Sequence, residues 1–120
     1  MAFASLQQVA IDCPEPRALA EFYQSICGGE IDDSRSDGSW VQLSVPDGAD
    51  LGFQLAPEHG PQPWPAAAPL VHLDFFVDDL DDGEAAVLAL GATKSEVQPT
   101  PDRWRVFVDP AGYPFCLVNP

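Results

Sequence analysis

Basic side chains are scarce in this sequence of 120 residues. Five lysines and arginines stand against 19 aspartates and glutamates, which gives a formal net charge of −14. A protein that binds nucleic acid presents a basic surface to the phosphate backbone, so we expect no nucleic-acid partner. Charge of one sign keeps a protein soluble through self-repulsion, and it also suits a pocket that attracts cationic ligands. Both interpretations of the acidity remain open.

Cysteine is also sparse. Cys13, Cys27 and Cys116 are an odd number, and no two of them have the Cys-x-x-Cys spacing. This argues against a disulfide framework and a zinc knuckle, and it favours a reducing compartment. The sequence further lacks an apolar run of membrane-spanning length and a charged leader followed by an apolar segment. We therefore expect a cytoplasmic protein with no membrane partner.

An internal repeat with a spacing of 64 residues is the main positive feature of the sequence. Residues 6–14 and 70–78 have the same build, with Gln8 in the position of His72. The correspondence continues at 46–48 and 110–112, and again at 51–53 and 115–117. The chain thus contains two copies of one unit, and we expect its chemistry to lie between them.

The first copy has the pattern of a β-α-β-β-β unit. Alternating apolar and polar residues predict strands at 8–13, near 31, at 40–45 and at 51–55. Pro14 and Pro16 suit the first turn of a helix, and Gly28 suits its end. The helix presents an apolar stripe at helical spacing, formed by Leu19, Phe22, Tyr23 and Ile26.

The second copy repeats this order, with strands predicted at 71–77, 93–97, 104–108 and 115–118 and a helix from about residue 80 to Gly91. Five prolines between 57 and 69 predict a stiff, extended linker, in which we interpret His59 as a solvated residue. The predicted organisation is one domain over 1–120, with a first module at about 5–56, the linker at 57–69 and a second module at about 70–120.

Two βαβββ modules, the run HLDFFVDDL, LGA after the second helix and DPAGYPFCLV near the end resemble the vicinal oxygen chelate superfamily. That superfamily includes glyoxalase I, bleomycin-resistance proteins, fosfomycin-resistance transferases and extradiol dioxygenases. The resemblance covers nearly the whole chain and is strongest to small glyoxalase-like domains of unassigned function. It implies an α+β fold, in which both modules form one cupped, eight-stranded mixed sheet with helices on the convex side, and it implies a homodimer. The cup forms either within one chain or across a swapped dimer.

The resemblance also implies divalent-metal ligands on the first and last strands of each module, at positions that correspond to Gln8, Gly52, His72 and Cys116. In the superfamily these positions usually hold histidine, glutamine or glutamate on the first strands and most often glutamate on the last. Glycine has no ligating side chain, and a thiolate selects softer metals than carboxylates do. We expect no cofactor, and we assign Gln8, His72 and Cys116 as the ligands of a divalent metal if one binds.

Side-chain alternation predicts further residues on the concave face with His72. Asp74 would either pair with His72 for proton transfer or for binding a cationic ligand, or make a structural contact that holds the imidazole. Trp40 and Phe107 would either sandwich a flat ligand or fill the cup themselves. Cys116 is either a nucleophile with a lowered pKa or an inert buried thiol. The predicted ligand-binding residues are Asp12, Trp40, Gln42, Gln54, Asp74, Phe76, Arg105 and Phe107.

Two function hypotheses follow. The first is a metal-independent protein, similar to bleomycin-resistance proteins, that binds a cationic or aromatic small molecule in the cleft. The alternative is a metal-dependent lyase or isomerase resembling glyoxalase I, acting on a thiol adduct. An extradiol dioxygenase would need two histidines and a carboxylate around iron, and the sequence offers no such set. Because the fold hosts several chemistries, the sequence does not name the ligand or settle whether the protein is an enzyme.

Overall fold

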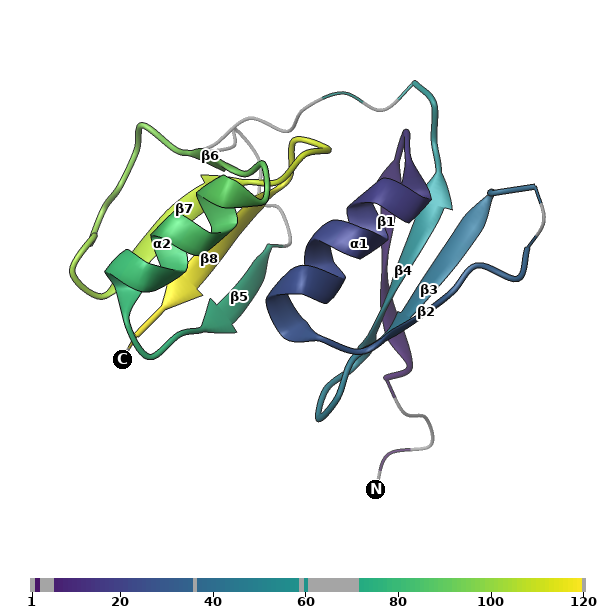
Figure 1. The fold of residues 1–120 in the computed structure, drawn as a ribbon, viewed down its shortest axis with the longest axis horizontal. Coiled ribbons are helices and arrows are strands. Elements are labelled where there is room, and N and C mark those ends of the chain that lie inside the picture. Colours follow the sequence, from purple (N-terminus) through teal and green to yellow (C-terminus); the bar gives the residue numbers. More distant parts are fainter. Residues whose placement is uncertain (1, 3–5, 36, 59, 61–71, 120) are drawn as a thin grey trace. The chain divides into compact units, whose positions relative to one another are not determined.

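The computed structural model describes residues 2, 6–35, 37–58, 60 and 72–119 (Figure 1). The chain divides into two compact units, Met1–His59 and Gly60–Pro120, which are called the first and second units below. Most of the predicted linker, including His59, and the start of the strand predicted from Val71 lie outside the described residues.

The first unit contains one helix and a four-stranded mixed sheet. Its elements are β1 (Gln8–Cys13), α1 (Pro16–Cys27), β2 (Glu30–Asp32), β3 (Trp40–Ser44) and β4 (Asp50–Leu55). The strand order is β1-β4-β3-β2. β1 runs parallel to β4, whereas β3 is antiparallel to both β4 and β2.

The second unit has the same topology. Its elements are β5 (Leu73–Phe76), α2 (Leu80–Ala89), β6 (Thr93–Lys94), β7 (Trp104–Val108) and β8 (Pro114–Val118). The strand order is β5-β8-β7-β6, with β5 parallel to β8 and the other pairs antiparallel. The register confirms the repeat, because Ala10 pairs with Gly52 in the first unit and Asp74 pairs with Cys116 in the second. Asp74 lies 64 positions after Ala10, and Cys116 lies 64 positions after Gly52, which is the spacing of the sequence repeat.

The residues at the ends of both helices explain where these helices begin and end. α1 has proline in its first turn, and its C-cap Gly28, the residue after Cys27, has a φ of 73°, a conformation that glycine adopts without strain. α2 is capped by Asp79, whose carboxylate accepts a hydrogen bond of 2.9 Å from the backbone N–H of Asp82. Such a cap contributes about 1 kcal/mol to helix stability.

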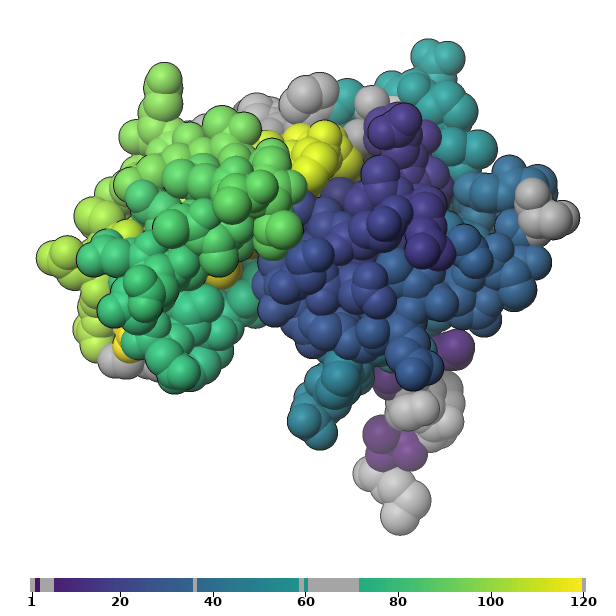
Figure 2. Space-filling model, viewed as in Figure 1, coloured from purple at the N-terminus to yellow at the C-terminus, as the bar shows by residue number. Residues whose placement is uncertain are grey.

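Each helix packs on one face of its own sheet and encloses a separate core. In the first unit Tyr23 of α1 stacks on Phe53 of β4 with ring centroids 6.0 Å apart. In the second unit Phe107 of β7 stacks on Phe115 of β8 at 5.8 Å. Burial of each such side chain contributes about 1.5–3 kcal/mol. Figure 2 shows these helix-covered faces, with the atoms of α1 and of α2 in front of their own sheets.

The predicted α+β class and the two βαβββ modules are confirmed. The strands form two separate four-stranded sheets, so the joined eight-stranded cup stays a prediction. Within the described residues, no helix has the length and apolar character needed to cross a membrane.

Candidate functional site

Each sheet has a face that points away from its own helix, which we call the outer face. Strand pairing in the second unit assigns Asp74 of β5, Cys116 of β8 and Val106 of β7 to this face, because paired residues share a face. His72, which directly precedes β5, lies on the same face and lines a pocket with Asp74 and Cys116. The structure thus brings three of the predicted site residues, His72, Asp74 and Cys116, together in one pocket.

The prediction that Arg105 and Phe107 share this face is wrong. Arg105 pairs with Leu117 and Phe107 pairs with Phe115, so both point to the face that α2 covers. Phe107 is fully buried in the core of the second unit. Alternation along β7 was correct in its spacing but was assigned to the wrong faces.

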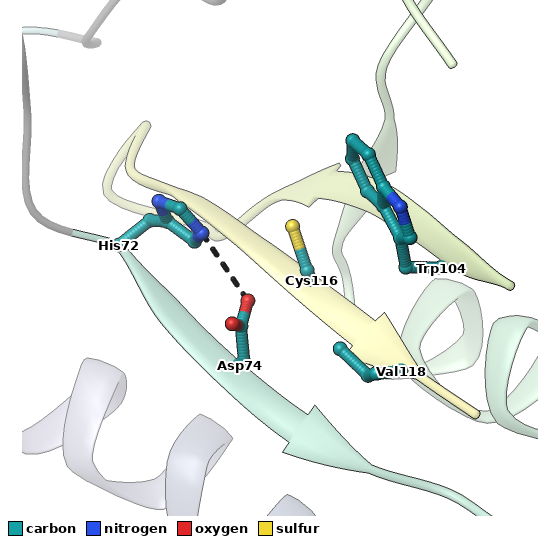
Figure 3. A pocket seen from close by; sticks show the side chains of 5 residues that line it. All are labelled: His72, Asp74, Trp104, Cys116 and Val118. Carbon is teal, nitrogen blue, oxygen red and sulfur yellow. Dashed lines mark ion pairs between the residues drawn. The ribbon is translucent and has the colours of Figure 1, made fainter. Parts of the chain in front are cut away.

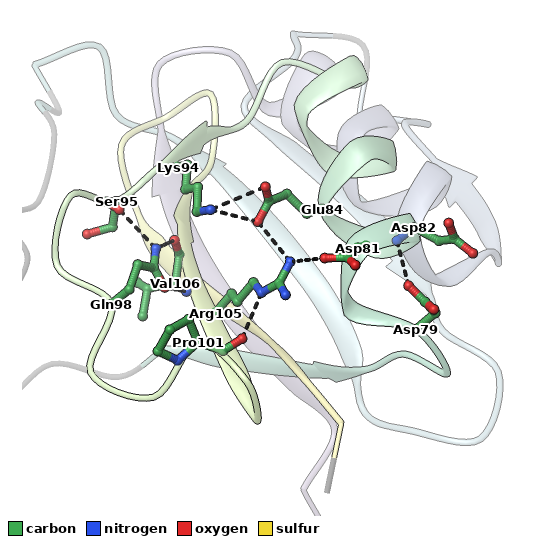
Figure 4. A network of polar contacts seen from close by, with 10 residues as sticks. All are labelled: Asp79, Asp81, Asp82, Glu84, Lys94, Ser95, Gln98, Pro101, Arg105 and Val106. Atoms are coloured by element: carbon green, nitrogen blue, oxygen red, sulfur yellow. Dashed lines mark hydrogen bonds and ion pairs between the residues drawn. The ribbon is translucent and has the colours of Figure 1, made fainter.

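Arg105 is held against α2 by a polar network (Figure 4). Its Nη1 lies 2.9 Å from Asp81 Oδ1 and 3.2 Å from Glu84 Oε1, and its Nε donates to the carbonyl oxygen of Pro101 at 2.8 Å. The side chain is only 15% exposed. Hydrogen bonding to Asp81 raises the pKa of Arg105, so the guanidinium remains charged beneath the helix. The Arg105 side chain therefore binds α2 and does not point to the outer face.

The pocket on the outer face of the second unit has a volume of about 320 Å³. As Figure 3 shows, Cys116 and Val118 of the central strand β8 form its floor, with Trp104 of β7 on one side and His72 and Asp74 on the other. Apolar surface from Trp104 and Val118 thus faces a polar side that carries an imidazole and a carboxylate. This composition is typical of small-molecule pockets.

The three polar side chains of the pocket interact with one another. His72 Nε2 lies 3.2 Å from Asp74 Oδ1, and the Asp74 side chain is 59% exposed. Burial raises the pKa of the Cys116 thiol to about 12, and the negative charge of Asp74 and a hydrogen bond to it act in the same direction. The thiol therefore stays protonated at neutral pH in the metal-free protein, which favours the inert thiol over the nucleophile.

The equivalent positions in the first unit carry different chemistry. Gln8, Ala10 and Gly52 occupy the places of His72, Asp74 and Cys116. Trp40 stands where the second unit has Trp104, and its indole lies over Gly52, since a β-carbon on Gly52 would be 2.2 Å from Trp40 Cζ2. The ring thus fills the space that a side chain at position 52 would need.

The remaining predicted residues lie on outer faces. In the first unit Gln42 accepts a hydrogen bond of 2.9 Å from Trp40 Nε1 and donates one of 2.7 Å to Gln8 Oε1. Asp12 and Gln54 are register partners at the end of the same face. A polar pocket of about 360 Å³ is lined by Gln7, Asp32, Ser34, Arg35, Trp40, Gln42 and Asp50. In the second unit Phe76 is 67% exposed on the outer side of β5.

Trp104 and Val118 are the pocket residues that sequence reasoning missed. The signal was present, because Trp104 lies 64 positions after Trp40, which was assigned to the outer face. The repeat therefore indicates the observed orientation of β7, which the hydrophobic pattern of β7 alone does not.

Comparison with known proteins agrees with this architecture. A family model described as a glyoxalase-like domain matches residues 8–118. The chain belongs to the glyoxalase-like domain family. Its predicted membership of the vicinal oxygen chelate superfamily is confirmed by this match. A search of the curated proteins finds no match for this glyoxalase-like domain.

Three solved structures illustrate the likeness. A glyoxalase family protein from Enterococcus faecalis is 25% identical with a TM-score of 0.66, and the match covers 99% of this chain and 100% of that one. A glyoxalase/bleomycin resistance protein/dioxygenase family enzyme from Burkholderia phytofirmans is 23% identical with a TM-score of 0.69, over 95% and 97% of the two chains. A fosfomycin resistance protein from Listeria monocytogenes is 16% identical with a TM-score of 0.72, over 98% and 93%. The last two show the fold alone.

The metal ligands that the superfamily resemblance implies do not fit this glyoxalase-like domain as a set. Gly52 has no side chain and is covered by Trp40, while the amide oxygen of Gln8 accepts a hydrogen bond from Gln42. The second unit supplies a thiol at the position where a carboxylate is usual. A hard cation such as Mg²⁺ or Mn²⁺ prefers oxygen ligands, and these four positions do not provide them.

Proposed function

We propose that this glyoxalase-like domain binds a small molecule in the second-unit pocket, without the catalytic metal set of its superfamily. The observation that supports the proposal is the division of the pocket into an apolar side and a polar side. Trp104 and Val118 suit a flat or apolar group, and the exposed carboxylate of Asp74 suits a cation. We therefore expect the ligand to be an aromatic cation.

Benzamidinium, with neutral benzamide as its isostere, is a suitable pair of probes. Titration of the chelator-treated protein, followed by amide chemical shifts, should show binding of benzamidinium at Trp104 and Val118. The Asp74→Asn change should weaken benzamidinium by about tenfold, which corresponds to roughly 1.4 kcal/mol for one charge-assisted hydrogen bond. Benzamide should be little affected by Asp74→Asn, whereas Trp104→Ala should weaken both probes.

Glu96→Gln is the matched control, because it removes one negative charge beyond β6, at the edge of the sheet opposite β5. If Glu96→Gln weakened benzamidinium as much as Asp74→Asn, binding would reflect the overall charge of −14 and the proposal would fail. Shifts confined to residues outside the pocket would also contradict it.

A homodimer is part of this proposal, because the superfamily resemblance implies one. Sedimentation velocity at several protein concentrations tests it. A species of twice the 12.9 kDa chain mass is the expected result, and a monomer at all concentrations would contradict it.

A metal-dependent lyase or isomerase resembling glyoxalase I is the second candidate function. The observation that favours it is the cluster of His72, Asp74 and Cys116, whose potential ligand atoms all lie within 4.8 Å of one another. Consumption of methylglyoxal with a thiol, by protein reloaded with Zn²⁺, Co²⁺, Ni²⁺ or Mn²⁺, is the test. Turnover that disappears in His72→Gln would support it, and turnover equal in both proteins would reject it.

A further inference from the structure

We propose that the second unit alone binds a divalent ion of the zinc class through His72, Asp74 and Cys116, and that it discriminates against Mg²⁺ and Mn²⁺. Asp74 is not among the positions at which the superfamily resemblance implies a ligand. The proposed site therefore differs from the implied one in its donor atoms, in its preferred metal and in needing no residue of the first unit.

The distances support a site that forms with small side-chain movements. The potential ligand atoms of the three residues lie within 4.8 Å of one another. Zn–N, Zn–O and Zn–S bonds of about 2.0–2.3 Å in tetrahedral geometry place ligand atoms roughly 3.2–3.8 Å apart. His72 Nε2 and Asp74 Oδ1 are already separated by 3.2 Å, so Cys116 Sγ needs the main adjustment.

The backbone supports the same arrangement. Asp74 and Cys116 are register partners on the parallel strands β5 and β8, and His72 is two residues before Asp74 on the same face. Two of the three donors are thus fixed by one strand pair, and the third follows from alternation. Figure 3 shows that His72, Asp74 and Cys116 point toward the same space.

The first unit provides an internal comparison. With the same fold, it has Gln8, Ala10 and Gly52 at the three equivalent positions, and Trp40 covers the last of them. Only one of these can offer a side-chain ligand atom. The donors of the second unit are therefore not a consequence of the fold itself but of three particular side chains.

The donor types decide the preferred metal. Imidazole and thiolate favour Zn²⁺ and Co²⁺ over Mg²⁺ and Mn²⁺, which prefer all-oxygen sites. This inference is independent of the proposed small-molecule function, because benzamidinium binding is measured in chelator and metal binding is measured without any organic probe. Each can fail without the other.

Titration of the metal-free full chain with Co²⁺, followed by absorption spectroscopy, tests the proposal. We expect one Co²⁺ per chain, the visible bands of tetrahedral cobalt and a near-ultraviolet charge-transfer band from thiolate to cobalt. Zn²⁺ should displace Co²⁺ and bleach these bands, while a large excess of Mg²⁺ or Mn²⁺ should not. An absent charge-transfer band, or displacement by Mg²⁺, would overturn the proposal.

Variants assign the ligands. Cys116→Ser should abolish the charge-transfer band, and Asp74→Ala and His72→Gln, which install the first-unit residues, should each weaken Co²⁺ roughly tenfold or more. Cys27→Ser is the matched thiol control, because Cys27 lies in the first unit. Its thiol donates a hydrogen bond to the carbonyl oxygen of Tyr23 in its own helix. Loss of the band in Cys27→Ser, or unchanged affinity in Asp74→Ala, would overturn the assignment. Circular dichroism verifies folding, and His72→Gln remains informative where Cys116→Ser does not fold.

Discussion

At the residue scale, Gly52 shows how one position decides what a module can do. Its missing side chain leaves room for the indole of Trp40 above it, since a β-carbon there would approach Trp40 Cζ2 to 2.2 Å. At the equivalent position of the second unit Cys116 keeps its side chain, and the space above it is a pocket. Two tryptophans at the same place in the repeat therefore differ in what they cover: Trp40 lies over Gly52, whereas Trp104 leaves the space above Cys116 open.

This close contact predicts the effect of Gly52→Ala. The added methyl group forces the indole of Trp40 away, and overpacking of this kind costs about 1–3 kcal/mol of unfolding free energy. Urea denaturation measures the loss. Gly48→Ala is the matched control, because its nearest contact is Val45 Cγ1 at 3.9 Å. Combining Gly52→Ala with Trp40→Leu should recover part of the loss, and strictly additive effects would contradict the contact.

Cys27 predicts a pH dependence of stability. Burial raises the pKa of its thiol above the ordinary value of 9.0, so the folded protein holds this proton more tightly than the unfolded chain. The corresponding stability is fully present below pH 9 and is lost as pH rises through the folded pKa. Urea denaturation from pH 7 to 10.5 should show the wild type losing stability relative to Cys27→Ser only above about pH 9. A constant difference over the whole range would refute the prediction.

At the scale of elements, Arg105 joins β7 to α2. Its guanidinium contacts Asp81 and Glu84 of the helix and the carbonyl oxygen of Pro101. Because the Arg105 side chain is only 15% exposed, removing it takes a poorly solvated positive partner away from the carboxylates of Asp81 and Glu84. Arg105→Gln should therefore lower the unfolding free energy by about 1–3 kcal/mol in thermal or urea denaturation.

Arg17 supplies the comparison for this prediction. It pairs with Glu21 and Asp33 on the first unit, but its side chain is 53% exposed. Exposed pairs of this kind contribute about 0–1 kcal/mol, so Arg17→Gln should cost clearly less than Arg105→Gln. Equal losses would show that the network under α2 has no special importance for stability.

The strands differ in how far alternation could predict their faces. In β1 the apolar residues Val9 and Ile11 alternate with polar Gln8 and Asp12, so the buried face was unambiguous. In β7 both faces carry apolar side chains, and Arg105 marks the helix side only because α2 provides carboxylates. Hydrophobic pattern gives the period of a strand, but an ion pair from another element can reverse which face is buried.

The candidate site was predictable to a similar extent. His72 and Asp74 were named because they alternate on one predicted strand, and Cys116 because the superfamily resemblance implies a ligand at its position. Trp104 and Val118 depended on the register of β7 against β8, which hydrophobicity does not encode. The joining of both modules into one cup depends on the linker at 57–69, whose five prolines indicate stiffness but not direction.

At the scale of the whole molecule, the net charge of −14 predicts a strong effect of salt. Like charges repel in the folded state, and raising the ionic strength from 0.01 M to 0.15 M shortens the Debye length from about 30 Å to about 8 Å. The melting temperature of the metal-free protein should therefore rise by a few degrees between these NaCl concentrations. Glu96→Lys, which lowers the net negative charge, should reduce the rise. A melting temperature independent of salt would show that the acids are compensated locally.

The indole of Trp40 over Gly52 also constrains how this protein can change over generations. A mutation that placed glutamate at position 52 would meet the ring before it could offer a ligand. Introducing that ligand would therefore need a second change at Trp40. The first unit cannot gain a donor at position 52 through one substitution, whereas the second unit, which has a pocket above Cys116, can exchange one donor at a time.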